Sequence, residues 1–386
     1  MLAIAGGFPN SDNPFITGIF VKEQLESIKS YFKEINVIST VTKGRNSNLN
    51  LNILQDYSQQ NLHVYYSKST SNPLKSMKIR GGRYKVLKRL VKKKKIQFDL
   101  IHAHFGVSGE YYGVKLKKEF NVPLVTSFYG SDVYLNTINA NYYANLSKNG
   151  DLFIVLSNHM KEKLIQLGFP SDKIFISRIG VDCQKFNFDR SKKISDNVLN
   201  LLLIANFVEK KGILDAINAF KISLEKVPKL NFTIVGSGPL KDMINELIET
   251  NKLSEKITML DNLNSSNPRG MVLNELKNAD IFILPSKTAS NGDCEGTPVV
   301  LMEASASGIP CITTRHSGNP EVIIHEKTGL VCEEGAIENL AKAIIELATN
   351  QEKRMEFGKN ARLFMLENYN NQIQRENLLE IYKKAF

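Results

Sequence analysis

Short runs of apolar residues alternate with amphipathic stretches along the whole chain. An apolar run bounded by turn-forming residues is typical of a buried strand, whereas apolar residues that recur every three or four positions indicate a helix. In the first half we predict strands at residues 1–5, 35–40, 62–66, 100–104, 124–128 and 152–156. The helical period appears at residues 18–32 and 158–167. Strands that alternate with helices are typical of crossover units on a parallel sheet.

The same alternation begins again after a polar, charged stretch at residues 187–195. The second series predicts strands at 201–205, 231–235, 257–260, 281–284 and 309–313, and helices at 213–224, 240–249, 299–307 and 340–349. We therefore predict an α/β protein with two doubly wound domains, at residues 1–190 and 191–371. A C-terminal helix at residues 372–386 is a candidate to cross back to the first domain. Doubly wound sheets bind ligands at the carboxyl ends of their strands, so we expect the substrates in a cleft between the domains.

The composition agrees with a folded globular protein. Hydrophobic residues make up 42% of the chain and charged residues 23%, which excludes a disordered or fibrous protein. The length of 386 residues is enough for two or three domains, each with a full core.

The positive charge is concentrated in one segment. Fifty Lys and Arg residues against 39 Asp and Glu residues leave a net charge of +11, and residues Lys75–Lys95 hold eleven basic residues and no acid. Apolar residues at helical spacing within this segment predict a basic amphipathic helix. Two interpretations stay open, a helix on an anionic membrane surface and a solvated helix face. Nucleic-acid binding is disfavoured, because few aromatic residues are present to stack on bases.

The four cysteines indicate neither a disulfide framework nor a zinc site. Cys183, Cys294, Cys311 and Cys332 lie far apart, with no histidine at ligand spacing. The first residues lack the basic start and the apolar run of a signal peptide, and no stretch of about 18 apolar residues occurs. We therefore expect a cytoplasmic protein that does not span a membrane.

The most informative window is residues 293–310, which carries two glutamates and a helix start. Glu295 lies just before the predicted helix and Glu303 two turns inside it, so both side chains can line one site. The free amides that follow Glu295 and the helix dipole favour an anion such as a diphosphate. One carboxylate can then accept hydrogen bonds from sugar hydroxyls and the other from ribose hydroxyls. In the alternative interpretation, Glu295 only caps the helix and Glu303 lies on its solvent face.

Two further segments follow predicted strands of the second domain. Lys211 lies between the end of a strand and a helix start, where a cation can neutralise a leaving phosphate. A turn that contains Gly236, Gly238 and Pro239 allows the backbone to approach a nucleoside closely. Each feature also has a simpler interpretation, as a surface lysine and as an ordinary tight turn, and neither is specific by itself.

Taken together, these residues and further motifs resemble glycosyltransferase family 4, whose members have the GT-B fold of two Rossmann-like domains facing a central cleft. The resemblance covers nearly the whole chain and depends on an ordered series of motifs. The similar segments are residues 13–21, 99–105, 126–132 and 178–182 in the first domain, and 206–212, 236–240, 279–286, 293–310 and 318–322 in the second. Residues 102–106 and 292–296 are most similar to members that assemble exopolysaccharides such as colanic acid or amylovoran.

The resemblance implies transfer of a sugar from a nucleotide-diphosphate sugar to a hydroxyl of a glycan or of a polyprenyl-linked or other lipid-linked acceptor, with retention at the anomeric carbon. It implies no cofactor and no metal, and the sequence contains no Asp-x-Asp triplet. A membrane-anchored acceptor would give the segment Lys75–Lys95 a role at the inner face of the cell membrane. Retention in this fold is commonly described as a front-face substitution in which the departing phosphate helps to deprotonate the acceptor, so we nominate no protein base.

The resemblance also implies roles for single residues. Glu295 would contact the donor sugar, Glu303 the ribose and Lys211 the diphosphate, so Glu295 and Lys211 are the catalytic candidates. The predicted donor-binding residues are Gly18, Asn206, Lys211, Gly236, Gly238, Pro239, Glu295, Gly296, Thr297, Val299 and Glu303. The predicted acceptor-side residues are His104, Tyr129 and Asp132.

Two residues depart from the family pattern. Asn206 stands where an arginine usually shares the diphosphate charge with the lysine, so Lys211 carries more of that charge. Tyr129 stands where a histidine usually lies near the donor sugar, and a phenol is no base at neutral pH. His104 is the nearest alternative histidine, unless it is a buried residue with a structural hydrogen bond only. Two alternative functions are a nucleotide-sugar epimerase of the same fold and a non-catalytic sugar-nucleotide-binding protein.

Overall fold

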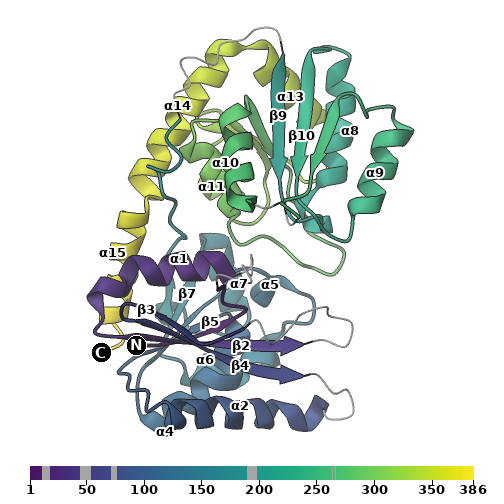
Figure 1. The fold of residues 1–386 in the computed structure, drawn as a ribbon. Coiled ribbons are helices and arrows are strands. Elements are labelled where there is room, and N and C mark those ends of the chain that lie inside the picture. The colour runs from purple at the N-terminus through teal and green to yellow at the C-terminus, as the bar shows by residue number, and fades with distance from the viewer. Residues whose placement is uncertain (11–17, 44–53, 71–75, 189–197, 263, 266) are drawn as a thin grey trace. The chain divides into compact units, whose positions relative to one another are not determined.

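The protein divides into two compact units. The computed structural model describes residues 1–10, 18–43, 54–70, 76–188, 198–262, 264–265 and 267–386. Unit 1 comprises Met1–Val133, Thr137–Ile179 and Gln374–Phe386, and unit 2 comprises Tyr134–Asn136 and Gly180–Ile373. The colours of Figure 1 follow the chain through both units.

Unit 1 is built on an eight-stranded sheet with the order β3-β4-β2-β1-β5-β6-β7-β8. Its strands are β1 (Leu2–Gly6), β2 (Ile35–Lys43), β3 (Tyr57–Gln59), β4 (Leu62–Thr70), β5 (Ile101–His104), β6 (Leu124–Ser127), β7 (Leu152–Val155) and β8 (Ile174–Ile176). All neighbouring strands are parallel except β3 and β4. The sequence pattern predicted no strand at residues 57–59, and the predicted parallel sheet therefore has one further, antiparallel strand at this edge. Only Gln60 and Asn61 join β3 to β4, which is enough for a hairpin and too short for a parallel crossover.

The α-helices of unit 1 connect these strands. They are α1 (Ile19–Ile28), α2 (Ser76–Lys93), α3 (Gly106–Ser108), α4 (Val114–Phe120), α5 (Ser131–Tyr134), α6 (Ala144–Asn149), α7 (Asn158–Gln166) and the end of α15 (Asn371–Lys383). Leu378, Ile381 and Tyr382 of α15 are buried in the same hydrophobic core as β1 and α1. The last helix thus completes the core of unit 1, although it is the last element of the chain.

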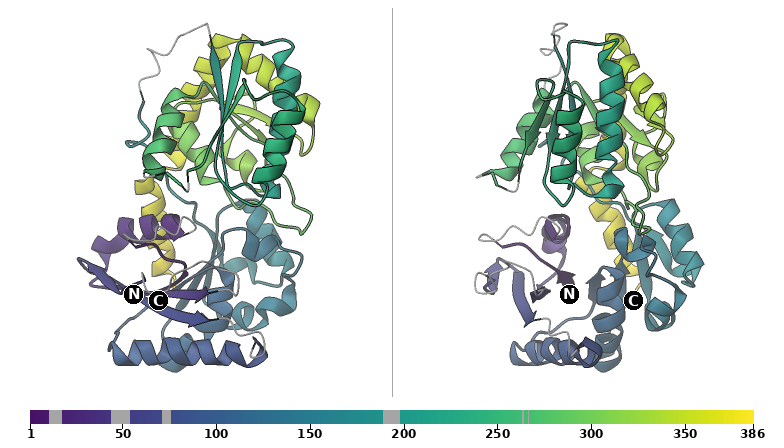
Figure 2. Two further views of the ribbon diagram at one scale, coloured as in Figure 1. Left: turned by 45° about the vertical axis from the view of Figure 1, so that its right-hand side comes forward. Right: turned by 90° about the vertical axis from the view of Figure 1, so that its right-hand side faces the viewer.

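Unit 2 is built on a six-stranded sheet that is parallel throughout, with the order β11-β10-β9-β12-β13-β14. Its strands are β9 (Leu199–Ile204), β10 (Leu230–Val235), β11 (Ile257–Leu260), β12 (Ile281–Leu284), β13 (Cys311–Thr314) and β14 (Gly329–Cys332). Its α-helices are α8 (Ile213–Leu224), α9 (Lys241–Thr250), α10 (Pro268–Asn278), α11 (Val299–Ala306), α12 (Asn319–Val322), α13 (Ile337–Thr349) and α14 (Gln351–Asn368). Helices cover both faces of this sheet, as the views in Figures 1 and 2 show.

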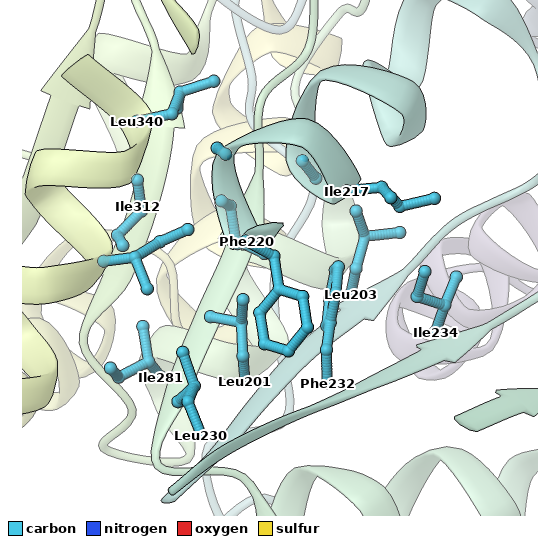
Figure 3. Close-up of a cluster of buried hydrophobic side chains, with 14 of the residues drawn as sticks. Leu201, Leu203, Ile217, Phe220, Leu230, Phe232, Ile234, Ile281, Ile312 and Leu340 are labelled. Atoms are coloured by element: carbon cyan, nitrogen blue, oxygen red, sulfur yellow. The ribbon is translucent and has the colours of Figure 1, made fainter. Parts of the chain in front are cut away.

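The core of unit 2 lies between the sheet and the helices α8 and α13. Figure 3 shows its centre, where Leu201 and Leu203 of β9 pack with Phe220 of α8. The strands are apolar on both faces because helices cover both, so the sequence shows continuous apolar runs and no alternation.

The strand orders of the two sheets indicate where a ligand is expected to bind. In both units the strand that comes first in sequence lies at the centre, and later strands are added on one side and then on the other. The order therefore reverses between β1 and β5 in unit 1 and between β9 and β12 in unit 2. Doubly wound sheets bind their ligands beyond the carboxyl ends of the strands at this switch point. The predicted fold of two doubly wound domains is confirmed.

The boundary between the units lies at Ile179 and Gly180, whereas the sequence pattern placed it at residue 190. The reason is a backbone contact that the pattern does not reveal. The amide of Val181 donates to the carbonyl of Tyr369 at 2.8 Å, and the amide of Asn371 donates back to Val181 at 3.2 Å. These bonds hold the residues after Gly180 in unit 2.

Gly212, in the loop after β9, packs closely against Pro285 in the loop after β12. This contact generates the first prediction. It has φ 64°, and a Cβ atom there would lie 1.9 Å from the carbonyl oxygen of Pro285. We expect Gly212→Ala to lower the free energy of unfolding by about 3 kcal/mol or more, because left-handed strain and overpacking add. Chemical denaturation measures this loss.

Gly335 provides the matched control. It has φ 71°, but a Cβ atom there would meet no atom within 4 Å. Gly335→Ala should therefore cost only the conformational strain, about 1–2 kcal/mol. Equal losses of unfolding free energy in Gly212→Ala and Gly335→Ala would show that the contact with Pro285 does not constrain the loops.

Candidate active site

The two central strands of unit 2 carry opposite charges beyond their carboxyl ends. Lys211 ends a short 3-10 helix that follows β9, and Glu295 lies in the loop between β12 and α11. The Lys211 Nζ and Glu295 Oε1 atoms are 2.6 Å apart, and the two side chains are 14% and 9% exposed. Two candidate residues that are distant in sequence thus meet at the switch point of the sheet.

Glu295 is held in its charged form by lysines. Burial raises the pKa of Glu295, but Lys211 and Lys210 lower it further, and the net shift is below the ordinary value. Lys210 lies 3.0 Å from Asp293 Oδ2 and donates to the carbonyl of Cys294 at 3.2 Å. The site therefore contains two lysines where the sequence analysis nominated Lys211 alone. The sequence did not indicate that the ammonium groups of the adjacent residues Lys210 and Lys211 both contact the loop of residues 293–295.

Two hydroxyl oxygens at this site are buried with no hydrogen-bond partner in the described part of the chain. They are the Oγ1 atom of Thr297 and the Oγ atom of Ser286. Glu295 Oε1 is paired with the Lys211 ammonium at 2.6 Å. Buried polar atoms in native proteins nearly always have partners, so these oxygens indicate a place for a polar ligand.

The backbone of Glu295 is fixed from both sides. Its amide donates to Nε2 of His316 at 3.0 Å, and its carbonyl accepts from Oγ of Ser317 at 2.6 Å. His316 Nδ1 in turn lies 2.5 Å from Glu334 Oε1, which assigns the ring proton to Nδ1. His316, Ser317 and Glu334 were missed by the sequence analysis. The only signal for His316 and Ser317 was that they lie a few residues after the strand predicted at 309–313, and Glu334 had none.

Glu303 is buried one turn inside α11. Its carboxylate is 2.8 Å from Nη1 of Arg269 in α10, and its side chain is 7% exposed. The alternative in which Glu303 lies on a solvent face is therefore wrong. The guanidinium of Arg269 also lies 5.6 Å from the ring centre of Phe186, and this cation was not foreseen.

The start of α11 and the glycine turn lie where the sequence analysis expected them. Pro298 precedes the helix and provides no side-chain cap, while Gly296 and Val299 lie on either side of this start. Gly236 and Gly238 have φ 157° and 154°, and a Cβ atom on Gly236 would lie 1.9 Å from the carbonyl of Ala205. These glycines therefore let the turn before Pro239 approach the loop after β9.

Two other donor-side candidates have less defined surroundings. Asn206 is exposed two residues after the end of β9, and its carbonyl accepts from the amide of Val208 at 2.8 Å. Gly18 precedes α1 in unit 1, where a Cβ atom would lie 2.3 Å from the carbonyl of Gly7. Most of the loop at residues 13–21 that carries the family resemblance lies outside the described residues.

The acceptor-side candidates lie together at the carboxyl ends of β5 and β6 in unit 1. His104 Nδ1 is 2.7 Å from the hydroxyl of Tyr129. Burial raises the pKa of Asp132, although its carboxylate accepts backbone amides of Gly106, Tyr129 and Gly130 at 2.9 to 3.0 Å. Asp132 thus holds the two loops together.

The basic helix α2 buries its apolar side. Leu87 and Val91 are buried in unit 1, so they are not available to insert into a lipid surface. Lys88 and Lys92 pair with Glu119 at 2.6 and 3.7 Å, and the segment begins with Lys75 outside the described residues. The predicted basic amphipathic helix is therefore present, with its apolar side packed in unit 1 and a charged outer face, and its role at a membrane surface stays a prediction. No described helix is both long enough and apolar enough to cross a membrane.

Comparison with known proteins finds two matching family models and several similar proteins. Residues 54–185 match the family described as Glycosyltransferase Family 4, and residues 184–364 match Glycosyl transferases group 1. AmsK of Erwinia amylovora, named as an amylovoran biosynthesis glycosyltransferase, is 32% identical over 297 residues, which are 76% of this chain and 72% of AmsK. WcaL of Escherichia coli K12, named for colanic acid biosynthesis, is 32% identical over 290 residues, covering 73% of this chain and 70% of WcaL.

A solved structure shares the fold. HepE of Anabaena, crystallised with UDP, aligns over 99% of both chains with a TM-score of 0.75 and 17% sequence identity. At this identity the likeness establishes the architecture only.

The buried ion pair generates the second prediction. Lys211→Met would leave Glu295 buried without its nearest cation, so we expect a loss of about 3 kcal/mol or more in the free energy of unfolding at pH 7. In the wild-type protein the lowered pKa of Glu295 contributes stability above its unfolded pKa, and this contribution is lost as the pH falls through the folded value. The difference in the free energy of unfolding between Lys211→Met and the wild type should therefore become smaller below about pH 4.

Lys241 provides the control, because its side chain is 44% exposed and lies 2.9 Å from Asp261 Oδ2. Lys241→Met should change stability by no more than about 0.5 kcal/mol. Denaturant titrations at several pH values measure both variants. A loss for Lys211→Met that does not depend on pH would contradict the assignment to Glu295.

Proposed function

The chain belongs to glycosyltransferase family 4, and from this membership we propose that it moves a sugar from a nucleoside-diphosphate sugar to a hydroxyl of a glycan or lipid-linked acceptor, in the assembly of a cell-surface polysaccharide. The observation that carries this proposal is the buried pair of Lys211 and Glu295 at the switch point of unit 2. The relatives named for amylovoran and colanic acid biosynthesis support the kind of product. The UDP bound to HepE supports the kind of donor.

In this proposal the positive and negative groups of the site bind different parts of the donor. Lys211 and the amides at the start of α11 stabilise the diphosphate as negative charge builds on it, which is the electrostatic contribution that usually dominates. The Glu295 carboxylate, which is paired with Lys211, accepts a hydrogen bond from a sugar hydroxyl. Because the lysines provide the positive charge, we propose that transfer needs no metal. Loss of transfer after treatment with EDTA would contradict this.

We propose that transfer proceeds with retention. The bond from the anomeric carbon to the phosphate oxygen breaks, and the bond to the acceptor oxygen forms on the same face. The departing phosphate oxygen takes the proton of the acceptor hydroxyl. Tyr129 is no base in this scheme, because burial raises the pKa of its phenol well above the ordinary value. A product of inverted anomeric configuration, seen by NMR, would contradict retention.

Lys210 is a candidate to replace the positive charge that is missing at Asn206, where the family pattern has an arginine. Asn206 is exposed and neutral, so it does not replace the arginine that relatives usually have there. Lys210 lowers the pKa of Glu295 and contacts Asp293 and the Cys294 carbonyl, so it acts on the same site. We propose that Lys210 supplies the second positive charge, through the loop of residues 293–295.

The third prediction tests donor binding by thermal shift. UDP, GDP, ADP and CMP are each added to the wild type and to Glu303→Ala. One diphosphate should stabilise the wild type, by about 2.7 kcal/mol at a concentration one hundred times its Kd. Glu303→Ala should lose this response, because its carboxylate is proposed to bind the ribose.

Glu346→Ala is the control, because Glu346 is an ion-paired glutamate of the same unit that contacts Lys353. Its nucleotide response should equal that of the wild type. If no nucleotide stabilises the wild type, the donor site is absent and the binding and transfer proposals both fail.

Conversion of a nucleotide sugar without any acceptor would favour an epimerase instead.

We further propose that the protein acts at the cytoplasmic membrane surface through the outer face of α2. Lys85, Arg89, Lys92 and Lys93 are exposed on this helix, and Lys94 and Lys95 are exposed directly after it. Lys94 pairs with Asp56 at 3.0 Å, so part of the charge is already neutralised. The rest is enough to attract an anionic surface, since each lysine near it contributes about 1 kcal/mol.

The fourth prediction follows from this face. Changing Lys92, Lys93, Lys94 and Lys95 together to Gln should weaken sedimentation with phosphatidylserine vesicles by at least about tenfold. Changing Lys221, Lys226, Lys229 and Lys256 of unit 2 to Gln removes the same charge and should have little effect. Equal weakening of vesicle binding by both sets of substitutions would indicate that binding depends on the net charge of the protein and not on a docking face.

A further inference from the structure

Two pairs of side chains lie just beyond the carboxyl ends of β13 and β14, which are parallel neighbours in the sheet of unit 2. Arg315 Nε lies 2.9 Å from Glu333 Oε1. His316 Nδ1 lies 2.5 Å from Glu334 Oε1. Successive residues of an extended chain point to opposite faces, so the two pairs differ in exposure. The side chains of the first pair are 59% and 66% exposed, whereas that of His316 is 1% exposed.

The second pair closes the base of the loop that carries Glu295. Glu334 Oε2 accepts the amide of Thr288 at 2.8 Å, while its Oε1 faces His316 Nδ1. His316 Nε2 accepts the amide of Glu295 at 3.0 Å. One carboxylate therefore holds both ends of the loop of residues 288–295, one end directly and the other through the imidazole. We name Glu334 and His316 together the clamp.

The hydrogen bonds of the clamp fix where the proton of His316 lies. A backbone amide can only donate, so the Nε2 atom that faces the Glu295 amide is the bare nitrogen of the ring. Burial raises the pKa of Glu334, but hydrogen bonds from Thr288 and His316 lower it further, and the net shift is below the ordinary value. Glu334 is therefore a charged acceptor, and it holds the ring proton on Nδ1.

The residue after His316 holds the other backbone group of Glu295. Ser317 has φ 45°, in the left-handed region that residues with a side chain rarely adopt. Its hydroxyl donates to the carbonyl of Glu295 at 2.6 Å. Strain of this kind persists where the surrounding structure requires it and is concentrated at functional sites. The turn after β13 thus presents two adjacent side chains to the amide and the carbonyl of one residue.

These backbone bonds matter because the side chain of Glu295 shares its cation with the reaction. Lys211 lies 2.6 Å from the Glu295 carboxylate. In the proposed function Lys211 also stabilises the diphosphate as negative charge builds on it, so its attraction to the carboxylate is weakened at that moment. The bonds from His316 and Ser317 do not depend on the lysine. They keep the backbone of Glu295 in place while Lys211 acts on the diphosphate.

We propose that His316 and Glu334 are positioning residues of the transfer reaction, which fix the backbone of Glu295 so that its carboxylate meets a hydroxyl of the donor sugar. The inference rests on the proposed transfer function, since that function assigns Glu295 to the sugar. A small misplacement of a group that binds the reactant lowers the rate steeply. Loss of the clamp should therefore impair turnover of a nucleotide sugar and leave the binding of a nucleoside diphosphate unchanged.

The fifth prediction concerns Glu334→Gln, which keeps the size of the side chain and removes its charge. The amide of Thr288 needs an oxygen acceptor, so the new side chain turns its NH2 group toward His316 Nδ1. The ring proton then moves to Nε2, where it faces the amide of Glu295. Nitrogen NMR of protein labelled at its six histidines, assigned with His316→Leu, should show His316 Nε2 bare in the wild type and protonated in Glu334→Gln. A protonated Nε2 in the wild type would overturn the proposal.

The kinetic readout separates positioning from folding. The probe is UDP-glucose, GDP-mannose or ADP-glucose, according to the diphosphate that the wild type binds, and release of that diphosphate is followed. Glu334→Gln and His316→Leu should each lower kcat/KM by about tenfold or more, the effect of one lost hydrogen bond to a buried amide. The affinity for the diphosphate, measured by calorimetry, should be unchanged. A wild-type kcat/KM in either variant, or an equal loss of diphosphate affinity, would overturn the proposal.

Two controls come from the same unit. Glu333→Gln removes the same charge from the exposed pair with Arg315 and should leave kcat/KM unchanged. His325→Leu removes another imidazole that accepts a backbone amide, that of Val331 at 3.0 Å, and should lower stability without a change in kcat/KM. A loss of kcat/KM in His325→Leu equal to that in His316→Leu would overturn the proposal, because the loss would then follow from stability alone.

The two proposals fail in different ways. Wild-type protein that binds no nucleotide contradicts the transfer function, whereas the protonation of His316 in the same sample still tests the clamp. Turnover that persists unchanged in Glu334→Gln and in His316→Leu overturns the positioning role and leaves the transfer function intact. Glu334 is partly exposed, and Glu334→Gln keeps the size of its side chain, so the test does not depend on how well His316→Leu folds.

Discussion

Lys211 and Glu295 lose most of their hydration where β9 and β12 end, and each is tolerated there because the other neutralises it. Breaking such a pair leaves an uncompensated charge, so the loops that carry it must hold their positions. Gly212 and Gly236 let those loops approach backbone carbonyls more closely than any side chain would permit. His316 and Ser317 bind the amide and the carbonyl of Glu295. The architecture of unit 2 around the switch point thus serves one ion pair.

The two units prepare their ligand-binding ends in opposite electrostatic ways. Unit 2 gathers lysines around a charged carboxylate, which suits a donor that leaves with two phosphates. Unit 1 keeps His102 and His104 neutral by burial and surrounds them with hydroxyls and aromatic rings. A neutral environment of this kind suits an uncharged sugar hydroxyl. In the proposed function, charge is therefore concentrated where the leaving group would develop it.

The sequence predicted the fold well because continuous apolar runs identify strands that helices cover on both faces. It also brought Lys211 and Glu295 into one site, since both follow strands that converge at a switch point. It failed for β3, where a hairpin of two connecting residues reverses direction, and for the short strands β8 and β14. It did not predict Arg269, Glu334 or Tyr382. Their partners lie up to 280 positions away in the chain, and only the folded packing selects them.

The most direct test of the central claim is a calorimetric titration of Glu295→Gln and wild type with a nucleoside diphosphate and with the matching nucleotide sugar. Our account assigns Glu295 to the sugar and Lys211 to the diphosphate. Glu295→Gln should therefore weaken binding of the nucleotide sugar by about tenfold or more, the worth of a charged hydrogen bond, while the diphosphate binds at least as tightly as before. Equal weakening of both ligands, or no change for the nucleotide sugar, would contradict the account.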